Sequence, residues 1–117
     1  MSRMSVTAVI TVRNGEKRIA RALESIVRQT RRPEQVMVVD GHSTDRTVEI
    51  AQEFDFVRVL QQPGHGIPDA YNFAVKSTKT DLIAFLSHDD EWTPDKIEIQ
   101  ADYHESHPGT LVTTALA

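Results

Sequence analysis

Two adjacent carboxylates are the groups of this chain best suited to hold a cation. Asp89 and Asp90 lie just after an apolar run at 82–86, separated from it by Ser87 and His88. Neighbouring carboxylates repel each other unless a cation lies beside them. A hard divalent ion such as Mg²⁺ takes one or two protein carboxylates together with phosphate oxygens and water. The pair therefore indicates a site for Mn²⁺ or Mg²⁺ that would bind a diphosphate. The alternative interpretation is a polar turn in front of a helix.

A further carboxylate, Asp40, directly follows a second apolar run at 36–39. An acid at the end of the second strand accepts hydrogen bonds from a ribose hydroxyl in dinucleotide-binding folds. The residues that follow, Ser43, Thr44 and Asp45, are turn and cap formers. Asp40 is therefore either a ligand-facing acid or the first residue of a turn, and the sequence leaves both interpretations open.

The glycine-rich phosphate motifs are absent from the chain. No G-x-G-x-x-G follows the first apolar run, and G-x-x-x-x-G-K-[ST] does not occur, which argues against an NAD enzyme and a P-loop NTPase. A diphosphate bound here would therefore need a metal. His42, His65 and His88 lie in polar segments without the spacing of a zinc site. We interpret them as polar loop residues, with His65 and His88 as candidates for a ligand contact.

Composition is typical of a globular domain. The 117 residues are 39% apolar and 26% charged, and they contain neither an apolar run long enough to span a bilayer nor a signal-peptide core at the start. Cysteine is absent, which excludes disulfides, thiolate zinc sites and cysteine nucleophiles. This absence also fits a reducing cytoplasm.

The net charge of −4 is unevenly distributed. Basic residues prevail at 13–32 and acidic residues at 81–105. We interpret the two segments as solvated helix faces of opposite sign. The alternative is a basic helix that lies on an anionic lipid surface. Nucleic acid is not predicted as a partner, because the aromatic residues do not interleave with the basic ones.

Apolar runs alternate with stretches of helical period along the chain. The predicted strands are 6–12, 36–39, 56–60 and 82–86, with a fifth beginning at 111–114, and the predicted helices are 19–27, 48–54, 67–75 and 94–106. Thr93 is expected to cap the last helix, with Pro94 at its first position. The alternation predicts an α/β fold of the Rossmann-like doubly wound type, with a mostly parallel sheet in three α/β/α layers and strand order 3-2-1-4. The polar loops that follow the strands would then all meet at the carboxyl edge of the sheet.

Four segments taken together resemble the family 2 glycosyltransferases, which have the GT-A type of fold. They are SVTAVITVRNGEKRIARALESIVRQT, VMVVDGHSTDRTVEIA, GHGIPDAYN and DLIAFLSHDDEWTPDKIEIQ, and they cover almost the whole chain. The resemblance implies transfer of a sugar, with inversion, from a nucleotide-sugar to a sugar or glycolipid acceptor in polysaccharide or glycoconjugate synthesis. UDP-sugars are the first expectation, with other NDP-sugars as alternatives. The expected location is the cytoplasm, with peripheral attachment to the inner face of the membrane left open.

The resemblance also implies a set of site residues. The donor-binding positions are Thr11, Arg13, Asn14, Asp40, Gly66, Asp69, Asn72, His88 and Asp89, and the metal-binding positions are Asp89 and Asp90. The chain departs from the family pattern at four places. Ser87 replaces the first acid of the D-x-D-like motif, Arg13 stands where an aromatic residue is common, Gly41 replaces a second acid, and Tyr71 replaces an arginine.

The catalytic residues remain unknown at this stage, because the family places its general base on a later segment, beyond Ala117. Residues 1–117 are therefore expected to form the nucleotide-sugar-binding domain, without the acceptor-binding half. A non-catalytic nucleotide-sugar-binding module or partner subunit is the alternative. An open sheet edge would also favour self-association. A receiver-like signalling domain is disfavoured, since the required acids are missing after the first and third strands.

Overall fold

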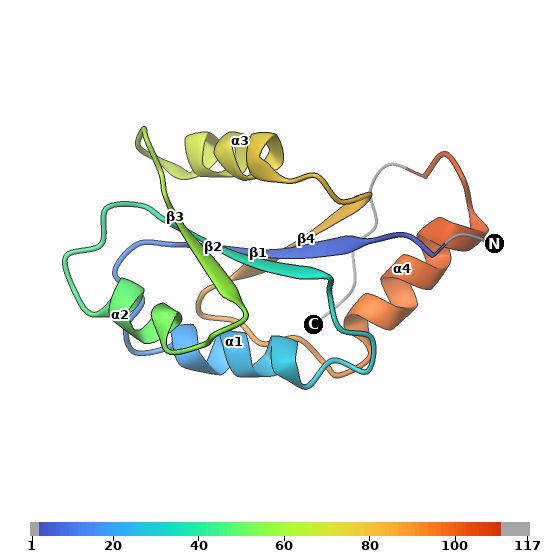
Figure 1. Ribbon diagram of the computed structural model, residues 1–117, viewed down its shortest axis with the longest axis horizontal. Helices are drawn as coiled ribbons and strands as arrows, with labels where there is room; N and C mark the ends of the chain where they lie inside the picture. Colours follow the sequence, from blue (N-terminus) through green and yellow to red (C-terminus); the bar gives the residue numbers. More distant parts are fainter. Residues whose placement is uncertain (1–2, 111–117) are drawn as a thin grey trace.

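The computed structural model describes residues 3–110 as alternating strands and helices (Figure 1). In chain order the elements are β1 (Val6–Val12), α1 (Ile19–Val27), β2 (Gln35–Asp40), α2 (Thr47–Gln52), β3 (Val57–Gln61), α3 (Ile67–Ser77), β4 (Leu82–Ser87) and α4 (Lys96–Ser106). Each predicted strand and helix in this range is present, with small shifts of its bounds. The strand predicted from 111 to 114 lies outside the described residues.

The four strands form one parallel sheet in the order β3-β2-β1-β4. This confirms the predicted order. β1 and β2 occupy the centre, and their nearly continuous apolar sequences are buried on both faces. The outer strands β3 and β4 are less completely buried. A parallel sheet places the carboxyl ends of all its strands at one edge, and this edge carries the polar loops.

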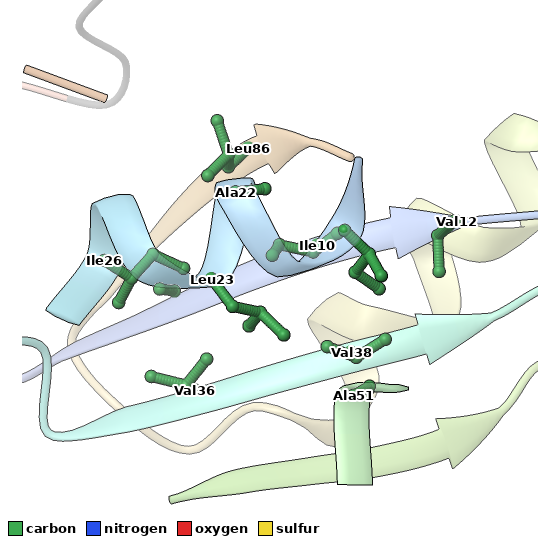
Figure 2. Close-up of a cluster of buried hydrophobic side chains, with 11 residues drawn as sticks. Ile10, Val12, Ala22, Leu23, Ile26, Val36, Val38, Ala51 and Leu86 are labelled. Atoms are coloured by element: carbon green, nitrogen blue, oxygen red, sulfur yellow. The ribbon is translucent and has the colours of Figure 1, made fainter. Parts of the chain in front are cut away.

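One face of the sheet is covered by α1 and α2. The apolar stripe of α1 contributes Ile19, Leu23 and Ile26, which are fully buried. These side chains belong to one cluster with Ile10 of β1 and Val38 of β2, most of it visible in Figure 2. Burial of an aliphatic side chain of this size contributes about 1.5–3 kcal/mol. The stripe therefore fixes α1 against the two central strands.

The opposite face is covered by α3, which packs through small side chains. Ala70 and Ala74 contact the cluster that Val9, Met37 and Val39 form on the central strands. Figure 1 shows α3 on one side of the sheet and α1 and α2 on the other. The predicted three-layer α/β/α arrangement is confirmed. None of the helices within residues 3–110 combines the length and apolar character needed to cross a bilayer.

The start of α4 differs from the prediction. The helix begins at Lys96, and its N-cap residue Asp95 makes no side-chain capping bond, so Thr93 is not its cap and Pro94 is not its first residue. The carbonyl oxygens of Thr93 and Pro94 accept hydrogen bonds from the end of α1 instead, from Gln29 Nε2 at 2.7 Å and Thr30 N at 2.7 Å. Gln29 Oε1 also accepts the Ile97 N–H at 3.0 Å. These bonds hold residues 93–95 outside the helix.

The basic and acidic segments contact each other, and the prediction of two solvated faces is wrong for Arg31. Its side chain is only 4% exposed. The guanidinium donates to Glu105 Oε2 at 2.9 Å and to the Met4 carbonyl at 2.6 Å, and Asp102 lies 3.5 Å away. On the surface, Arg21 forms a 2.8 Å ion pair with Glu91. The Arg31 contacts attach the C-terminal part of α4 to the segment before β2.

The hydrogen bond from Arg31 lowers the pKa of Glu105, with a further contribution from the Met4 N–H. A carboxyl group whose pKa is lower in the folded state stabilises the protein above its unfolded pKa. That stability is lost as the pH falls through the folded pKa.

Replacement of Glu105 by Gln should therefore reduce the loss of free energy of unfolding as the pH falls. Between about pH 5 and pH 3, near and below the ordinary glutamate pKa, the wild type should lose free energy of unfolding more steeply than Glu105→Gln. Urea denaturation at a series of pH values measures this. Glu98→Gln, an exposed change on the same helix, is the control. Identical losses for the wild type and Glu105→Gln would contradict the assignment.

Candidate functional site

The candidate site lies where the four strands end. Val12 of β1 pairs with Asp40 of β2, and Asp40 pairs with Gln61 of β3. On the other side, Thr11 pairs with Ser87 of β4. The loops that begin after these residues therefore leave the sheet side by side. This register brings the predicted positions around Thr11, Asp40 and Asp89 to one edge.

The loops after β1 and β2 are tied together by Asn14. Its N–H donates to Ser43 Oγ at 2.8 Å, and its side-chain Oδ1 accepts the Thr44 N–H at 2.8 Å. Asn14 has φ 54, a left-handed conformation that asparagine tolerates better than most residues. Since Thr44 occupies this oxygen, Asn14 positions the loops. Arg13 beside it is exposed.

A second layer of hydrogen bonds lies beneath this contact. The Gly15 N–H donates to the buried Thr47 hydroxyl at 2.8 Å, and the Glu16 N–H donates to Asp45 Oδ2 at 3.2 Å. Asp45 Oδ1 accepts the Thr47 N–H at 3.0 Å. The predicted turn role is seen for Asp45, whereas Ser43 and Thr44 contact Asn14 in the loop after β1. The part played by Thr47 was missed, because its partner is 32 positions away in the sequence.

Asp40 combines a turn role with an unused acceptor. Its residue is 1% exposed, and Oδ2 accepts the Ser43 N–H at 3.2 Å. Oδ1 is buried and has no hydrogen-bond partner among the described residues. Buried polar atoms without partners are uncommon in native proteins. The bond from Ser43 agrees with the turn interpretation. The other carboxylate oxygen of Asp40, Oδ1, can still accept a hydrogen bond.

The loop after β3 is organised by Gln62, which sequence reasoning did not single out. Its buried side chain donates from Nε2 to the Gly66 carbonyl and to Asp69 Oδ2, both at 2.9 Å. The carboxylate of Asp69 also lies against Gly64, where an added Cβ would come within 2.6 Å of Oδ2. Asp69 therefore shapes the loop, while Asn72 is exposed on α3. No local sequence signal identifies Gln62.

His88 packs against the loop after β1. A Cβ added to Gly15 would meet His88 Cδ2 at 2.7 Å and Val12 Cγ2 at 2.6 Å. Only a residue without a side chain fits beneath the imidazole ring. His88 thus brings the loop after β4 onto the loop after β1, and it supports the position of the acidic pair that follows it.

Asp89 is exposed and oriented by Ser87, whose hydroxyl donates to Asp89 Oδ1 at 2.6 Å. This hydrogen bond lowers the pKa of Asp89 and is the largest cause of the shift, with weaker attraction from Arg18. The carboxylate is therefore ionised at neutral pH. Ser87 stands at the place of the first acid in the D-x-D-like motif, and it donates a hydrogen bond to Asp89, the second acid. Asp90 is also exposed, and its N–H closes a turn onto the Ser87 carbonyl at 3.0 Å.

The acidic pair suits a partly hydrated divalent ion. Within residues 3–110 there is no group of three or more His, Cys, Asp or Glu side chains that would enclose a metal. One or two exposed carboxylates are nevertheless what Mg²⁺ commonly takes from a protein when substrate phosphates and water fill its other positions. The donor set of Asp89 and Asp90 fits such an ion.

Two histidines that sequence reasoning left as separate loop residues lie in contact. The rings of His42 and His65 have centroids 4.6 Å apart and are tilted by 30°. His42 Nε2 lies 2.9 Å from the Gly64 carbonyl oxygen. Both residues are exposed. They join the loop after β2 to the loop after β3 at the same edge that carries Asp40.

An open parallel sheet with polar loops at its carboxyl edge is the architecture of Rossmann-like nucleotide-binding domains. The family model for glycosyl transferase family 2 matches residues 7–116. The chain belongs to this family.

Curated relatives agree with this assignment. The chain is 33% identical over 96 residues to an uncharacterized glycosyltransferase of Rickettsia typhi, covering 81% of this chain and 30% of the relative. It is 36% identical over 101 residues to a chondroitin synthase of Escherichia coli, covering 83% of this chain and 15% of that protein. The chain thus spans less than a third of the length of these relatives.

Solved structures show the same fold. The crystal structure of S. aureus TarS 1-349 superposes with a TM-score of 0.79 at 27% identity, covering 89% of this chain and 33% of TarS. The mannosyltransferase PcManGT from Pyrobaculum calidifontis, in complex with GDP-Man and Mn²⁺, has a TM-score of 0.78 at 21% identity, covering 95% of this chain and 34% of that one. The predicted GT-A-type fold is confirmed.

The contact of His88 with Gly15 leads to a stability prediction. Gly15→Ala should lower the free energy of unfolding by about 1–3 kcal/mol, as is usual for overpacking, because the added methyl overlaps both His88 and Val12. Gly41→Ala is the matched control. Its closest neighbour is the end of the Gln62 side chain at 3.0 Å, so its effect should be smaller. Thermal and urea denaturation measure both, and a Gly15→Ala protein as stable as wild type would refute the proposed packing.

Proposed function

We propose that residues 1–117 form the donor-binding portion of a metal-dependent, inverting glycosyltransferase. The observation that carries this proposal is the ionised, exposed carboxylate of Asp89, which Ser87 orients at the carboxyl edge of the sheet. A divalent cation, Mn²⁺ or Mg²⁺, held by Asp89 and Asp90 would neutralise charge on the diphosphate of a nucleotide-sugar. The shape of the edge and the membership of the family support this assignment.

The nucleoside part of the donor would lie along the other loops of the same edge. The donor-binding residues in the proposal are Thr11, Arg13, Asn14, Asp40, Gly66, Asp69, Asn72, His88 and Asp89. The structure gives them different tasks. Asn14, Asp69 and His88 position loops, whereas Asp40 keeps a buried acceptor oxygen. UDP-sugars are the first candidates, because TarS has been solved with UDP-GlcNAc. GDP-sugars are the second, because PcManGT has been solved with GDP-Man.

The reaction in this proposal is a single displacement at the anomeric carbon. A hydroxyl of a sugar or glycolipid acceptor attacks this carbon from the side opposite the diphosphate, the bond from the carbon to the diphosphate oxygen breaks, and the configuration inverts. The hydroxyl proton passes to a general base, which we place on a later, acceptor-binding segment of the protein. We further propose a role in polysaccharide or glycoconjugate synthesis.

A peripheral position at the cytoplasmic face of a membrane is part of the same proposal. Lys17, Arg18 and Arg28 are exposed at or beside the ends of α1. Each basic residue close to an anionic lipid surface contributes about 1 kcal/mol of attraction. These basic residues at the two ends of α1 would thus favour a location where lipid-linked acceptors are available.

Calorimetric titration with nucleotides tests the metal-dependent donor site. UDP, GDP and dTDP should be titrated with and without Mn²⁺, and the best ligand should gain roughly tenfold or more in affinity with the metal, equivalent to about 1.4 kcal/mol. Asp89→Ala should remove this gain. Asp55→Ala, which changes an exposed acid before β3 at the opposite edge, should keep it. Nucleotide affinity that is insensitive to both the metal and Asp89→Ala would refute the proposal.

Self-association of this chain is a separate expectation that rests on the outer edge of β4. The strand sequence LIAFLS has no charge and no proline, and no further strand of residues 3–110 pairs with it beyond β1. The Leu82 N–H faces β1 through its bond to Ser5 O, so the backbone groups of Ile83 and Phe85 point outward. Such an uncharged edge favours pairing with another strand.

We expect association that increases with concentration, measured by light scattering. Phe85→Lys, which places a charge beside the open edge, should reduce it. Ile99→Lys replaces another exposed apolar residue, on α4, and should leave it unchanged. A monodisperse monomer at high concentration would contradict this expectation.

A further inference from the structure

We propose that His42, backed by His65, provides the flat surface on which the nucleobase of the donor stacks. This inference rests on the proposed nucleotide-sugar site and assigns its base-binding surface. It concerns two residues whose contact is visible only in the folded chain. The imidazole rings lie 4.6 Å apart, at the edge where the loops after β2 and β3 meet.

The position of His42 is fixed by three features. Asp40, two residues earlier, is buried and accepts the N–H of Ser43, one residue later. The His42 ring is bonded through Nε2 to the Gly64 carbonyl at 2.9 Å. The ring of His65 then lies against it. A ring held from its backbone, its edge and one face is ordered before a ligand arrives, which reduces the entropy lost on binding.

The backbone of His42 is in an unusual conformation. Its φ is 65, a left-handed value that glycine adopts without steric cost and that most side chains avoid. The presence of an imidazole ring at a position that suits glycine is a reason to look for a function of that ring. The contacts described above keep the ring in place without linking it to the hydrophobic core.

The pair leaves room for a ligand ring. Each imidazole has two faces, and the contact between them occupies one face of each, while both residues remain exposed. Arg13 lies close to the residue before His42, since its Cβ is 3.7 Å from the place where a Cβ on Gly41 would be. A planar base on the free face of His42 would stack on the imidazole ring, as bases stack on aromatic side chains. The two histidines would thus supply a stacking surface at an edge where residue 13 is arginine and not an aromatic residue.

The acids of the neighbouring loops do not suggest a metal at this pair. Within residues 3–110 no third histidine, cysteine or acid completes a metal-binding group with His42 and His65. Of the acids around these two loops, Asp40 is bonded to Ser43, Asp45 to Thr47, and Asp69 to Gln62. Stacking against a neutral planar ligand therefore fits the surroundings better than ion binding.

The test combines ring NMR signals with binding measurements on the chain of residues 1–117 in the presence of Mg²⁺. UDP, GDP and pyrophosphate are titrated against protein with labelled histidine, and each ring signal is assigned by substitution. His107 is the internal control. It stacks on Tyr103 with centroids 4.0 Å apart and bonds to the Tyr103 carbonyl, but it follows α4 beyond the opposite edge of the sheet.

The expected result is an upfield shift of the His42 ring protons, and a smaller one for His65, with UDP or GDP and not with pyrophosphate. His107 should not respond. His42→Asn, which tolerates the positive φ but lacks a ring, should weaken UDP or GDP binding roughly 5- to 30-fold, within the range for loss of a stacked base, and should leave pyrophosphate binding unchanged. His42→Tyr should restore most of the nucleotide affinity. Thermal unfolding of each variant verifies that it is folded.

Three outcomes would overturn the inference. Nucleotide binding that depends on the metal and on Asp89, with silent His42 signals and unchanged affinity in His42→Asn, would remove the stacking role and leave the donor site standing. Equal shifts with pyrophosphate would assign the pair to phosphate contact instead. Absence of binding by any nucleotide would remove the proposed function together with the base-stacking surface.

Discussion

The parallel pairing of β1 with both of its neighbours decides where each polar loop of this protein lies. Because Val12 stands opposite Asp40 and Thr11 stands opposite Ser87, three strands end within a residue of one another. A shift of either pairing by one residue would exchange the side chains of a strand between the two helix layers that cover the sheet. The two buried clusters on either side of the sheet therefore fix the register, and the register fixes the geometry of the edge.

At that edge, hydrogen bonds from side chains hold the loops in place, both within one loop and between two loops. Asn14 bonds the loop after β2, Gln62 bonds the start of α3, and Ser87 bonds Asp89. A few groups at this edge remain exposed, chiefly the acidic pair and the two histidines whose rings are in contact. The acidic pair of the proposed cation site is therefore separate from Asn14 and Gln62, which hold the loops.

The sequence was sufficient to predict the strands, their order and the place of Asp89, since all three follow from apolar periodicity and from the handedness of crossovers. It was not sufficient to predict contacts between loops. The bond from Thr44 to Asn14 joins positions 30 residues apart, and no local pattern specifies it. For the same reason the burial of Arg31 was missed, because the acids that neutralise it lie on α4, more than 70 positions away. The start of α4 was misplaced because Gln29 and Thr30, which follow α1, bond the carbonyl oxygens of Thr93 and Pro94.

The buried side chain of Gln29 has a consequence for the acidic pair. It bonds the Thr93 carbonyl and the Ile97 N–H, so the chain is anchored again soon after β4 releases it. The span that carries Asp89 and Asp90 is thus a short bridge between two fixed supports. A short segment anchored at both ends has little conformational freedom left to lose if the proposed cation binds. Affinity for the ion would then depend mainly on charge and solvation, with only a small contribution from loop closure.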